Sequence, residues 1–205
     1  LEHPFLAAPA DEASMRALAP QFWEGGDGSS VGAAWRQGLD RSYILLRADV
    51  RVEDREGINP YQAAYFTYSA AALHETSDAI PTWLVRGLSS VMSNILVRDD
   101  HVQVGRVLPQ HLQRLRSRSR MTLKEVVSHV RPGTTPLDTL EALDAHAWAF
   151  VHFLAFAEEG AHAPLLDAYV GAVLSGGDPA TSLASTIGDV SRFETPFAVY
   201  IGRTL

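Results

Sequence analysis

The chain has 205 residues, of which 46% are hydrophobic and 20% are charged, and it contains no cysteine. This balance is typical of a globular domain and excludes disordered chains, disulfide scaffolds and thiolate metal sites. The formal net charge of −7 argues against a general nucleic-acid-binding protein, and no apolar run approaches the roughly 20 residues that span a membrane. Because the sequence starts at Leu1 without a methionine or a signal-like stretch, we expect it to be a piece of a longer precursor.

The first 58 residues are predicted to be mainly β. Two β-like runs, residues 31–37 and 42–48, flank the turn-like segment 38–41 and predict a hairpin. The second run contains four consecutive apolar residues, 43–46, which indicates a well-covered strand rather than a solvated one.

From residue 59 onward the pattern is mainly helical. Asn59 can cap a helix and Pro60 fits its first position; this helix is predicted to end near Glu75. Apolar residues at steps of three and four predict further helices at residues 81–95, 108–115, 123–129, 138–158, 165–174, 179–187 and 193–201. The sequence therefore predicts one α+β domain over residues 1–205, with a small sheet first and helices packed on one face of it.

Three segments are similar to a known family of proteins in their framework residues and in their order along the chain. They are Tyr65-Phe66-Thr67-Tyr68-Ser69-Ala70, then Pro81-Thr82-Trp83-Leu84-Val85-Arg86-Gly87-Leu88-Ser89-Ser90, then Asp144-Ala145-His146-Ala147-Trp148. In their order and in framework residues such as Tyr68, they resemble the peptidase MA-like bacterial proteins, which are zinc peptidases of the gluzincin kind. The resemblance implies a zincin-like fold over nearly the whole chain and favours an exported location, periplasmic or extracellular.

The chemistry of that family needs two histidines four residues apart on one helix, with a catalytic glutamate beside the first. A glutamate on the next helix is the third protein ligand of the zinc ion. The resemblance places these roles on Phe66, Ala70, Thr67 and Arg86 respectively, and a further family glutamate on Ser90. Phenylalanine and alanine offer no lone pair, threonine is no base near neutral pH, and arginine is a permanent cation. The resemblance thus implies a degenerate site with no catalytic residue and no zinc or other cofactor.

One new pairing is expected at this degenerate site. Asp144 falls where relatives tend to have tyrosine, on a helix that should pass near the former metal position, with His146 two residues further on. A buried arginine requires a partner, so Arg86 is expected to pair with Asp144 across that position. The alternative is that Arg86 reaches solvent through an open cleft.

Other histidines are weaker candidates for metal ligands. The segment His74-Glu75-Thr76-Ser77-Asp78 approximates a zinc motif, but it lies at a helix end just before Pro81, where a surface histidine is the simpler interpretation. His146 and His152 are six residues apart, so they face different sides of their helix and cannot share a metal ion without another element.

Two further groups have competing interpretations. The basic residues Arg114, Arg116, Arg118 and Arg120 could meet phosphate or an acidic partner, or could form a solvated helix end. Trp23 and Trp35 are expected to belong to the core rather than to a ligand platform.

Three functions are compatible with these patterns. The first is a pseudopeptidase that binds a peptide or protein segment in the degenerate cleft, with residues 42–48 as an edge strand for strand addition. The second is a structural or assembly module, which a large apolar patch away from the cleft would support. The third is an active metal-dependent hydrolase with displaced ligands drawn from His74, Glu75 and His146.

Overall fold

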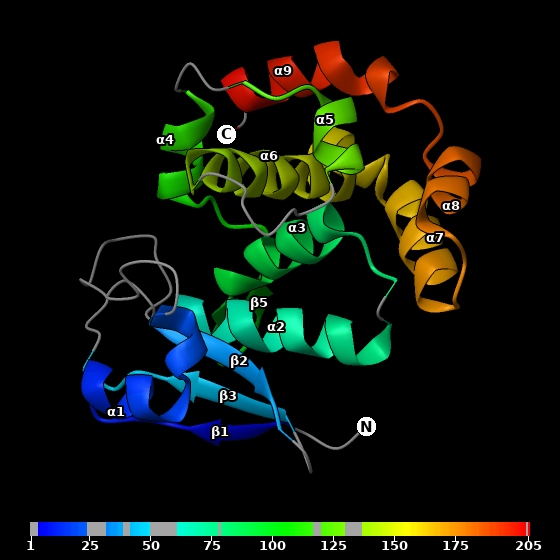
Figure 1. Cartoon of the computed structure of the whole chain (residues 1–205). Helices are drawn as coiled ribbons and strands as arrows, with labels where there is room; N and C mark the ends of the chain where they lie inside the picture. The colour runs from blue at the N-terminus through cyan, green and yellow to red at the C-terminus, as the bar shows by residue number, and fades with distance from the viewer. Residues whose placement is uncertain are drawn as a thin grey trace.

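The computed structural model describes residues 4–23, 32–38, 42–49, 61–77, 79–116, 120–129, 137–203 and 205. The strands are β1 (Phe5–Ala7), β2 (Ala33–Gln37), β3 (Ser42–Leu46), β4 (Leu96–Val97) and β5 (Val102–Gln103). The helices are α1 (Glu12–Leu18), α2 (Gln62–Thr76), α3 (Thr82–Ser93), α4 (Pro109–Leu115), α5 (Leu123–Ser128), α6 (Leu137–Phe156), α7 (Ala163–Leu174), α8 (Pro179–Thr186) and α9 (Glu194–Arg203). Short 3₁₀ turns lie at Pro20–Trp23, Ala157–Gly160 and Val190–Phe193. The protein is therefore α+β, with a small N-terminal sheet and a larger helical part (Figure 1).

Strand β3 is the centre of the three-stranded sheet, whose order is β1-β3-β2. β2 pairs with β3 antiparallel, with Trp35 opposite Ile44, and β1 pairs with β3 in parallel. The predicted antiparallel pair is confirmed, although residues 39–41 of the connection lie outside the described residues. The expectation that residues 42–48 form an edge strand is wrong, because β1 and β2 occupy both sides of β3 and leave it no free edge for strand addition.

Both faces of this sheet are covered. Successive side chains of a strand point to opposite faces. Leu45 and its partner Ala34 pack with Met15 of α1 in one apolar cluster, while Trp35 on the other face stacks on His74 of α2, with ring centroids 5.8 Å apart. The well-covered strand is confirmed, but the prediction of helices on one face only is wrong.

Helix α1 is an element of the first 58 residues that the sequence did not predict. Its seven residues begin after Asp11, whose carboxylate accepts a hydrogen bond from the Ser14 backbone N–H at 2.8 Å. This N-cap satisfies one of the orphan donors of the first turn. Met15 then fixes the helix on the sheet, because its side chain is fully buried.

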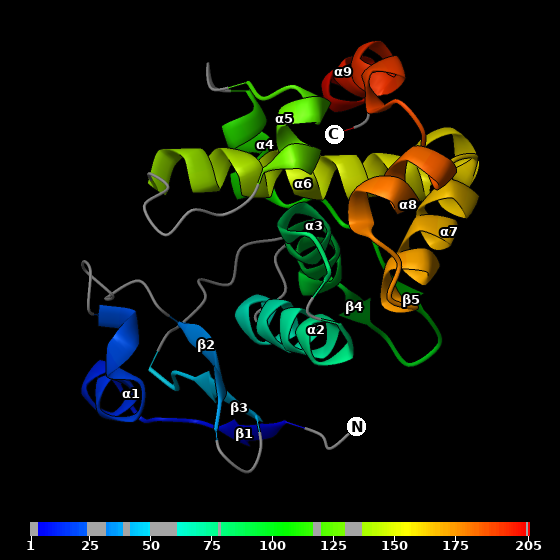
Figure 2. The ribbon, with the colours of Figure 1, turned by 45° about the vertical axis from the view of Figure 1, so that its right-hand side comes forward.

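The predicted helices of the second part are confirmed to within a few residues, and α6 is their centre. It packs against α3, α4, α5, α7 and α9. Figures 1 and 2 show α6 crossing the helical part, with α3 on the side facing the sheet and α9 on the far side. The β4–β5 hairpin between α3 and α4 was not predicted, and the cap expected at Asn59 and Pro60 lies outside the described residues.

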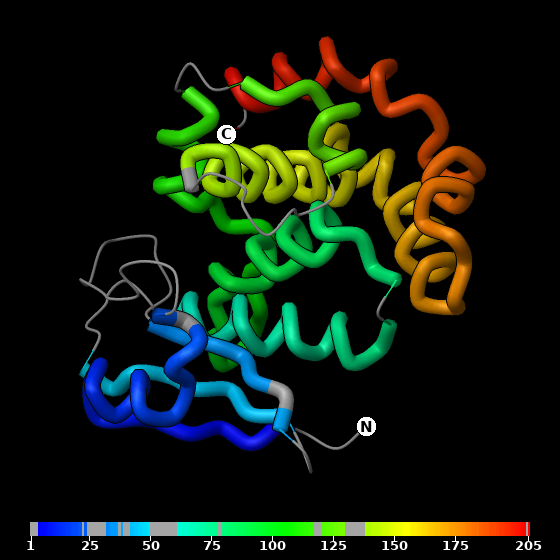
Figure 3. The backbone as a smooth tube through the Cα atoms, in the orientation of Figure 1, coloured from blue at the N-terminus to red at the C-terminus, as the bar shows by residue number. Residues whose placement is uncertain are grey.

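A glycine sets how closely α3 approaches α6. A Cβ atom on Gly87 would lie 2.5 Å from Val151 Cγ2 and 2.6 Å from the Ala147 carbonyl oxygen. Only a residue without a side chain therefore permits this crossing. The tube in Figure 3 shows the result: α3 lies between α2 and α6, so three helices meet in one region.

One property of the described helices bears on membranes. None of them combines the length and the apolar character that crossing a bilayer requires.

Candidate functional site

The candidate site is centred on the guanidinium group of Arg86, which α3 directs toward α6. Its Nε and Nη2 atoms donate hydrogen bonds to the two carboxylate oxygens of Asp144, and the Nε–Oδ1 distance is 2.5 Å. The Arg86 Cζ atom also lies 5.3 Å from the centre of the Phe66 ring on α2, which is within cation–π range. Three helices thus each contribute one side chain to the cluster, and the predicted pairing of Arg86 with Asp144 is confirmed.

The alternative, in which Arg86 simply reaches solvent, does not describe this geometry. The Arg86 side chain is 32% exposed and the Asp144 side chain 18% exposed, so the pair is partly withdrawn from water. From Ala142 to Leu154 every residue of α6 other than Asp144 is buried. A two-point contact of this kind holds the guanidinium plane in one orientation, unlike a single contact to a lysine ammonium.

His111 of α4 joins the cluster from the side, although sequence reasoning gave it no role. Its Nε2 atom lies 3.4 Å from the Ser90 hydroxyl on α3, and its ring lies 5.5 Å from that of Trp148. Burial lowers the pKa of His111 from its ordinary 6.5 to about 4; the Asp144 carboxylate opposes this shift and the Arg86 cation adds to it. At neutral pH His111 is therefore an uncharged imidazole, with one nitrogen available as an acceptor.

The five positions singled out by the resemblance do not all face one point. Phe66 and Arg86 are in contact, and the buried Ser90 reaches His111. Thr67 is buried within α2 and Ala70 packs against the main core, while the side chain of Tyr68 is exposed. With a guanidinium at its centre and no lone-pair donor at Phe66 or Ala70, this set of side chains does not fit a zinc ion.

His146 does not join the cluster, because its ring faces α5. Its Nδ1–H donates to the Ala142 carbonyl at 2.7 Å, and its Nε2 accepts from the Met121 N–H at 3.2 Å. His152 is satisfied on another side of α6, where Nε2–H donates to the Gly105 carbonyl at 2.6 Å and Nδ1 accepts from the Tyr200 hydroxyl at 2.7 Å. Burial lowers the pKa of both rings, and the hydrogen bonds to Ala142 and Gly105 partly offset the shifts. The prediction that the two histidines face different sides is confirmed, and both are structural.

The remaining metal candidates are also separated. His74 stacks on Trp35 of the sheet, and Asp78 lies outside the described residues. Within the residues that the structure describes, no three His, Asp or Glu side chains are grouped as a metal ion would require.

The basic run ends a helix, and only part of it reaches solvent. Arg116 and Arg120 are exposed, whereas Arg114 Nη2 donates to the Asp138 carbonyl at 2.7 Å and to the Asp138 carboxylate, tying α4 to the start of α6. Arg118 lies outside the described residues. Trp23 packs against the small cluster on the sheet, as expected, and Trp35 covers the opposite face.

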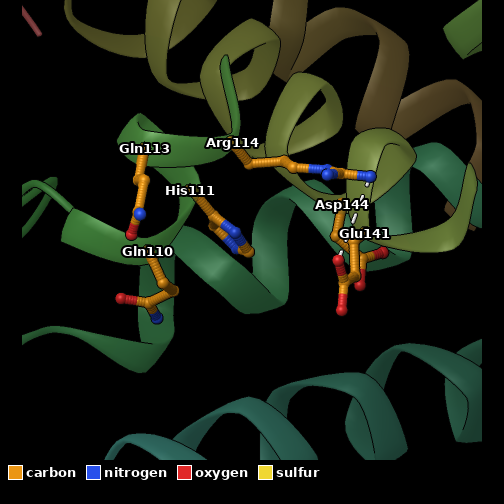
Figure 4. Close-up of a pocket in the computed structure, with 6 residues that line it drawn as sticks. All are labelled: Gln110, His111, Gln113, Arg114, Glu141 and Asp144. Atoms are coloured by element: carbon orange, nitrogen blue, oxygen red, sulfur yellow. Dashed lines mark ion pairs between the residues drawn. The ribbon is translucent and has the colours of Figure 1, made fainter. Parts of the chain in front are cut away.

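Beside the Arg86 cluster lies a cavity of about 440 Å³ between α4 and α6. Its lining residues are polar, namely Gln110, His111, Gln113, Arg114, Glu141 and Asp144. Figure 4 shows Gln110, His111 and Gln113 of α4 on one side and the two carboxylates of α6 on the other, with Arg114 reaching across from α4 to those carboxylates. Asp144 therefore belongs both to the ion pair and to the cavity wall.

No sequence signal marked Gln110, His111 or Glu141. They lie on two helices separated by the whole of α5, and only tertiary packing of α4 on α6 brings them together. No protein-family model, curated protein or solved structure gives a significant match to this chain.

Proposed function

We propose that the chain is a zincin-like domain that has lost peptidase chemistry and binds a peptide or protein segment in the cavity between α4 and α6. The observation that carries this proposal is the Arg86–Asp144 pair with the Phe66 ring beside it. The resemblance puts the metal ion where these three side chains meet. A cation held by a carboxylate keeps the region filled and charge-balanced without a metal ion.

The cavity has the size and chemistry that a peptide requires. Its volume of about 440 Å³ lies within the ~300–1,000 Å³ range of ligand sites. Gln110 and Gln113 are exposed amides on its rim, and each offers a carbonyl acceptor and an N–H donor. A peptide backbone presents the same two kinds of group in alternation, so it can pair with both side chains.

The alternative of an active metal-dependent hydrolase finds less support. It needs His74, Glu75 and His146 to converge on one ion. His74 instead stacks on Trp35 against the sheet, and both nitrogens of His146 are engaged by backbone groups at Ala142 and Met121.

The proposal is tested with untagged protein purified in the presence of zinc. We expect substoichiometric zinc by elemental analysis, no cleavage of a quenched fluorescent peptide mixture, and binding to a subset of an immobilised peptide library. The double variant Gln110→Ala/Gln113→Ala should weaken that binding, whereas Gln103→Ala, an exposed glutamine on β5, should not. One tightly held zinc ion per chain with peptide cleavage would contradict the loss of chemistry, and a library without any binder would contradict the binding role.

A second candidate, an assembly module, is favoured by one observation. Phe5 and Leu6 of β1 are 53% and 59% exposed, and Leu18 lies nearby on the wall of a hollow that also includes Phe5. Exposed apolar residues on an edge strand are typical of surfaces that pair with another chain. Sedimentation of the wild type and of Leu6→Lys over a range of concentrations would separate this candidate from peptide binding, because the cavity residues are unchanged.

A further inference from the structure

Among the described residues around the α4–α6 cavity, negative charges outnumber positive ones. Two guanidinium groups, those of Arg86 and Arg114, face three carboxylates, those of Asp138, Glu141 and Asp144. Arg86 is held by Asp144 through two hydrogen bonds, and Arg114 is held by Asp138. The excess is one negative charge, in agreement in sign with the net charge of −7 of the whole chain.

Glu141 carries this excess charge. Its nearest described cation is Arg114, whose Nη2 atom is 4.0 Å away and already donates to Asp138. The Glu141 side chain is 56% exposed, yet it forms part of the cavity wall beside Asp144, one turn further along α6. Its carboxylate oxygens can therefore accept hydrogen bonds from a group that enters the cavity.

On the opposite wall, the described residues add hydrogen-bond acceptors, and Arg114 is the one cation among them. Burial lowers the pKa of His111 to about 4, so its ring is neutral at pH 7. Figure 4 shows this ring extending from α4 toward Glu141 and Asp144, with Gln110 and Gln113 on the same helix. Hydrogen-bond acceptors thus line the cavity on both α4 and α6, an arrangement that suits a ligand rich in N–H donors.

We propose that this cavity receives a lysine or arginine side chain of a bound peptide, with Glu141 as its counter-ion and with His111 and the glutamine amides as acceptors. This inference rests on the proposed function, since it names the part of the peptide that the same cavity recognises. A ligand carboxylate would meet the negative charges of Glu141 and Asp144, and the Arg114 guanidinium that could attract it is already paired with Asp138 and Glu141. A ligand cation completes the charge balance and supplies the donors that these acceptors need.

The inference is tested with single-residue probes that do not depend on a peptide sequence. Nα-acetyl N-methylamides of arginine, lysine, norleucine and glutamate are titrated into isotope-labelled protein, and amide shifts of α4 and of residues around Glu141 are followed by NMR. We expect the arginine and lysine probes to shift these signals at concentrations where the norleucine and glutamate probes do not. Glu141→Gln should weaken the basic probes roughly tenfold, the loss typical of a charge-assisted hydrogen bond. The matched variant Asp167→Asn removes an exposed carboxylate from α7 and should leave binding unchanged.

The possible outcomes separate this inference from the function on which it rests. Equal shifts from the norleucine and arginine probes, preference for the glutamate probe, no shift up to the solubility limit, or full affinity in Glu141→Gln would each overturn it. Library peptides that bind without any basic residue in common would overturn it while leaving the peptide-binding role intact. Basic probes that bind in the cavity while no library peptide does would support the subsite and overturn the peptide-binding role.

Discussion

At the level of single residues, the contribution of Arg86 to the stability of the fold depends on the presence of Asp144, and the reverse is also true. A partly buried ion loses hydration, and its partner recovers that loss through direct hydrogen bonds. Removal of one partner leaves the other without compensation in a region only 18–32% exposed. If both are replaced by apolar residues of similar size, the free-energy cost of dehydrating the two ions disappears together with the ion pair.

A double-mutant cycle makes this dependence measurable. Arg86→Met and Asp144→Leu should each lower the free energy of unfolding by about 2 kcal/mol, because each leaves an unpaired charge. The double variant should lie within about 1 kcal/mol of the wild type, which corresponds to strong coupling. Urea unfolding followed by circular dichroism gives all four values. Additive losses in the double variant would show that the two side chains do not stabilise each other.

His111 predicts a specific loss of stability in acid. Its pKa is about 4 in the folded protein and about 6.5 in the unfolded chain, so the unfolded state binds the extra proton between these values. Stability contributed by the neutral ring is therefore present above pH 6.5 and declines as the pH falls toward 4. Between pH 7.5 and 4.5 the wild type should lose about 2–3 kcal/mol more than His111→Gln, by urea unfolding. His146 and His152 shift in the same direction but are present in both proteins, so their effect cancels. If the wild type and His111→Gln lose the same free energy of unfolding, the His111 ring is hydrated in the folded protein and not buried.

At the level of elements, the crossing of α3 over α6 determines whether the site exists. Gly87 sits against Ala147 and Val151, and the neighbouring Arg86 meets Asp144 one turn earlier on α6. A wider separation of these helices would draw the guanidinium away from the carboxylate. The glycine thus has a structural role next to the site rather than a chemical role in it.

Two glycine substitutions test this crossing. Gly87→Ala should destabilise the protein by about 3 kcal/mol, since the new methyl group would overlap backbone at 2.6 Å and no rotamer relieves it. Gly171→Ala on α7 is the matched control, because its Cβ would meet nothing within 4 Å and alanine favours a helix by roughly 0.5–1 kcal/mol. Thermal unfolding of both variants gives the comparison. A neutral Gly87→Ala would show that α3 and α6 can separate without cost.

The elements that could be predicted from the sequence were those with long-range periodicity. Helix α6 could be predicted because its apolar stripe runs along a helix of 20 residues, and the β2–β3 pair because two β-like runs flank a turn. α1 was missed because it is seven residues long and buries only Met15. β4 and β5 have two residues each, too few for an alternating pattern to show.

The sequence predicted a contact of the site only where one residue physically required a partner of known chemistry. An arginine in a covered position needs a carboxylate, and this argument found Asp144. No comparable requirement pointed to His111 or Glu141, because a histidine on a short helix and an exposed glutamate are ordinary in isolation. Their significance comes from the packing of α4 against α6, which no local pattern encodes.

At the level of the whole molecule, the described part of the chain has two apolar clusters of very different size. The larger one surrounds α6 and includes Trp83, Trp148 and Phe150, and the smaller one joins α1 to the sheet through Met15 and Leu45. Helix α2 packs on the sheet on one side and on α3 on the other. The positions that the resemblance singles out on α2 and α3 thus lie at the seam between the sheet and the helical part, and one of them, Ala70, packs against the larger cluster.

Restoring the family's ligands tests whether this seam has zincin-like geometry. The variant Phe66→His/Ala70→His/Arg86→Glu/Asp144→Asn places two histidines four residues apart on α2 and a glutamate on α3. Phe66 and Arg86 already meet across these helices, so the three new donors should reach one ion. We expect about one zinc ion per chain by elemental analysis after dialysis, and a higher melting temperature with zinc than without it, because binding to the folded state alone stabilises that state.

The matched control retains Ala70 and carries the other three substitutions. It lacks one ligand of the set and should hold zinc at least tenfold more weakly, as judged by competition with a chelating dye. A folded four-substitution variant that binds no more zinc than this control would mean that α2 and α3 do not present the family's ligand geometry. The zincin-like interpretation would then fail. The Arg86–Asp144 pair and the cavity beside it would need an explanation that does not involve a former zinc site.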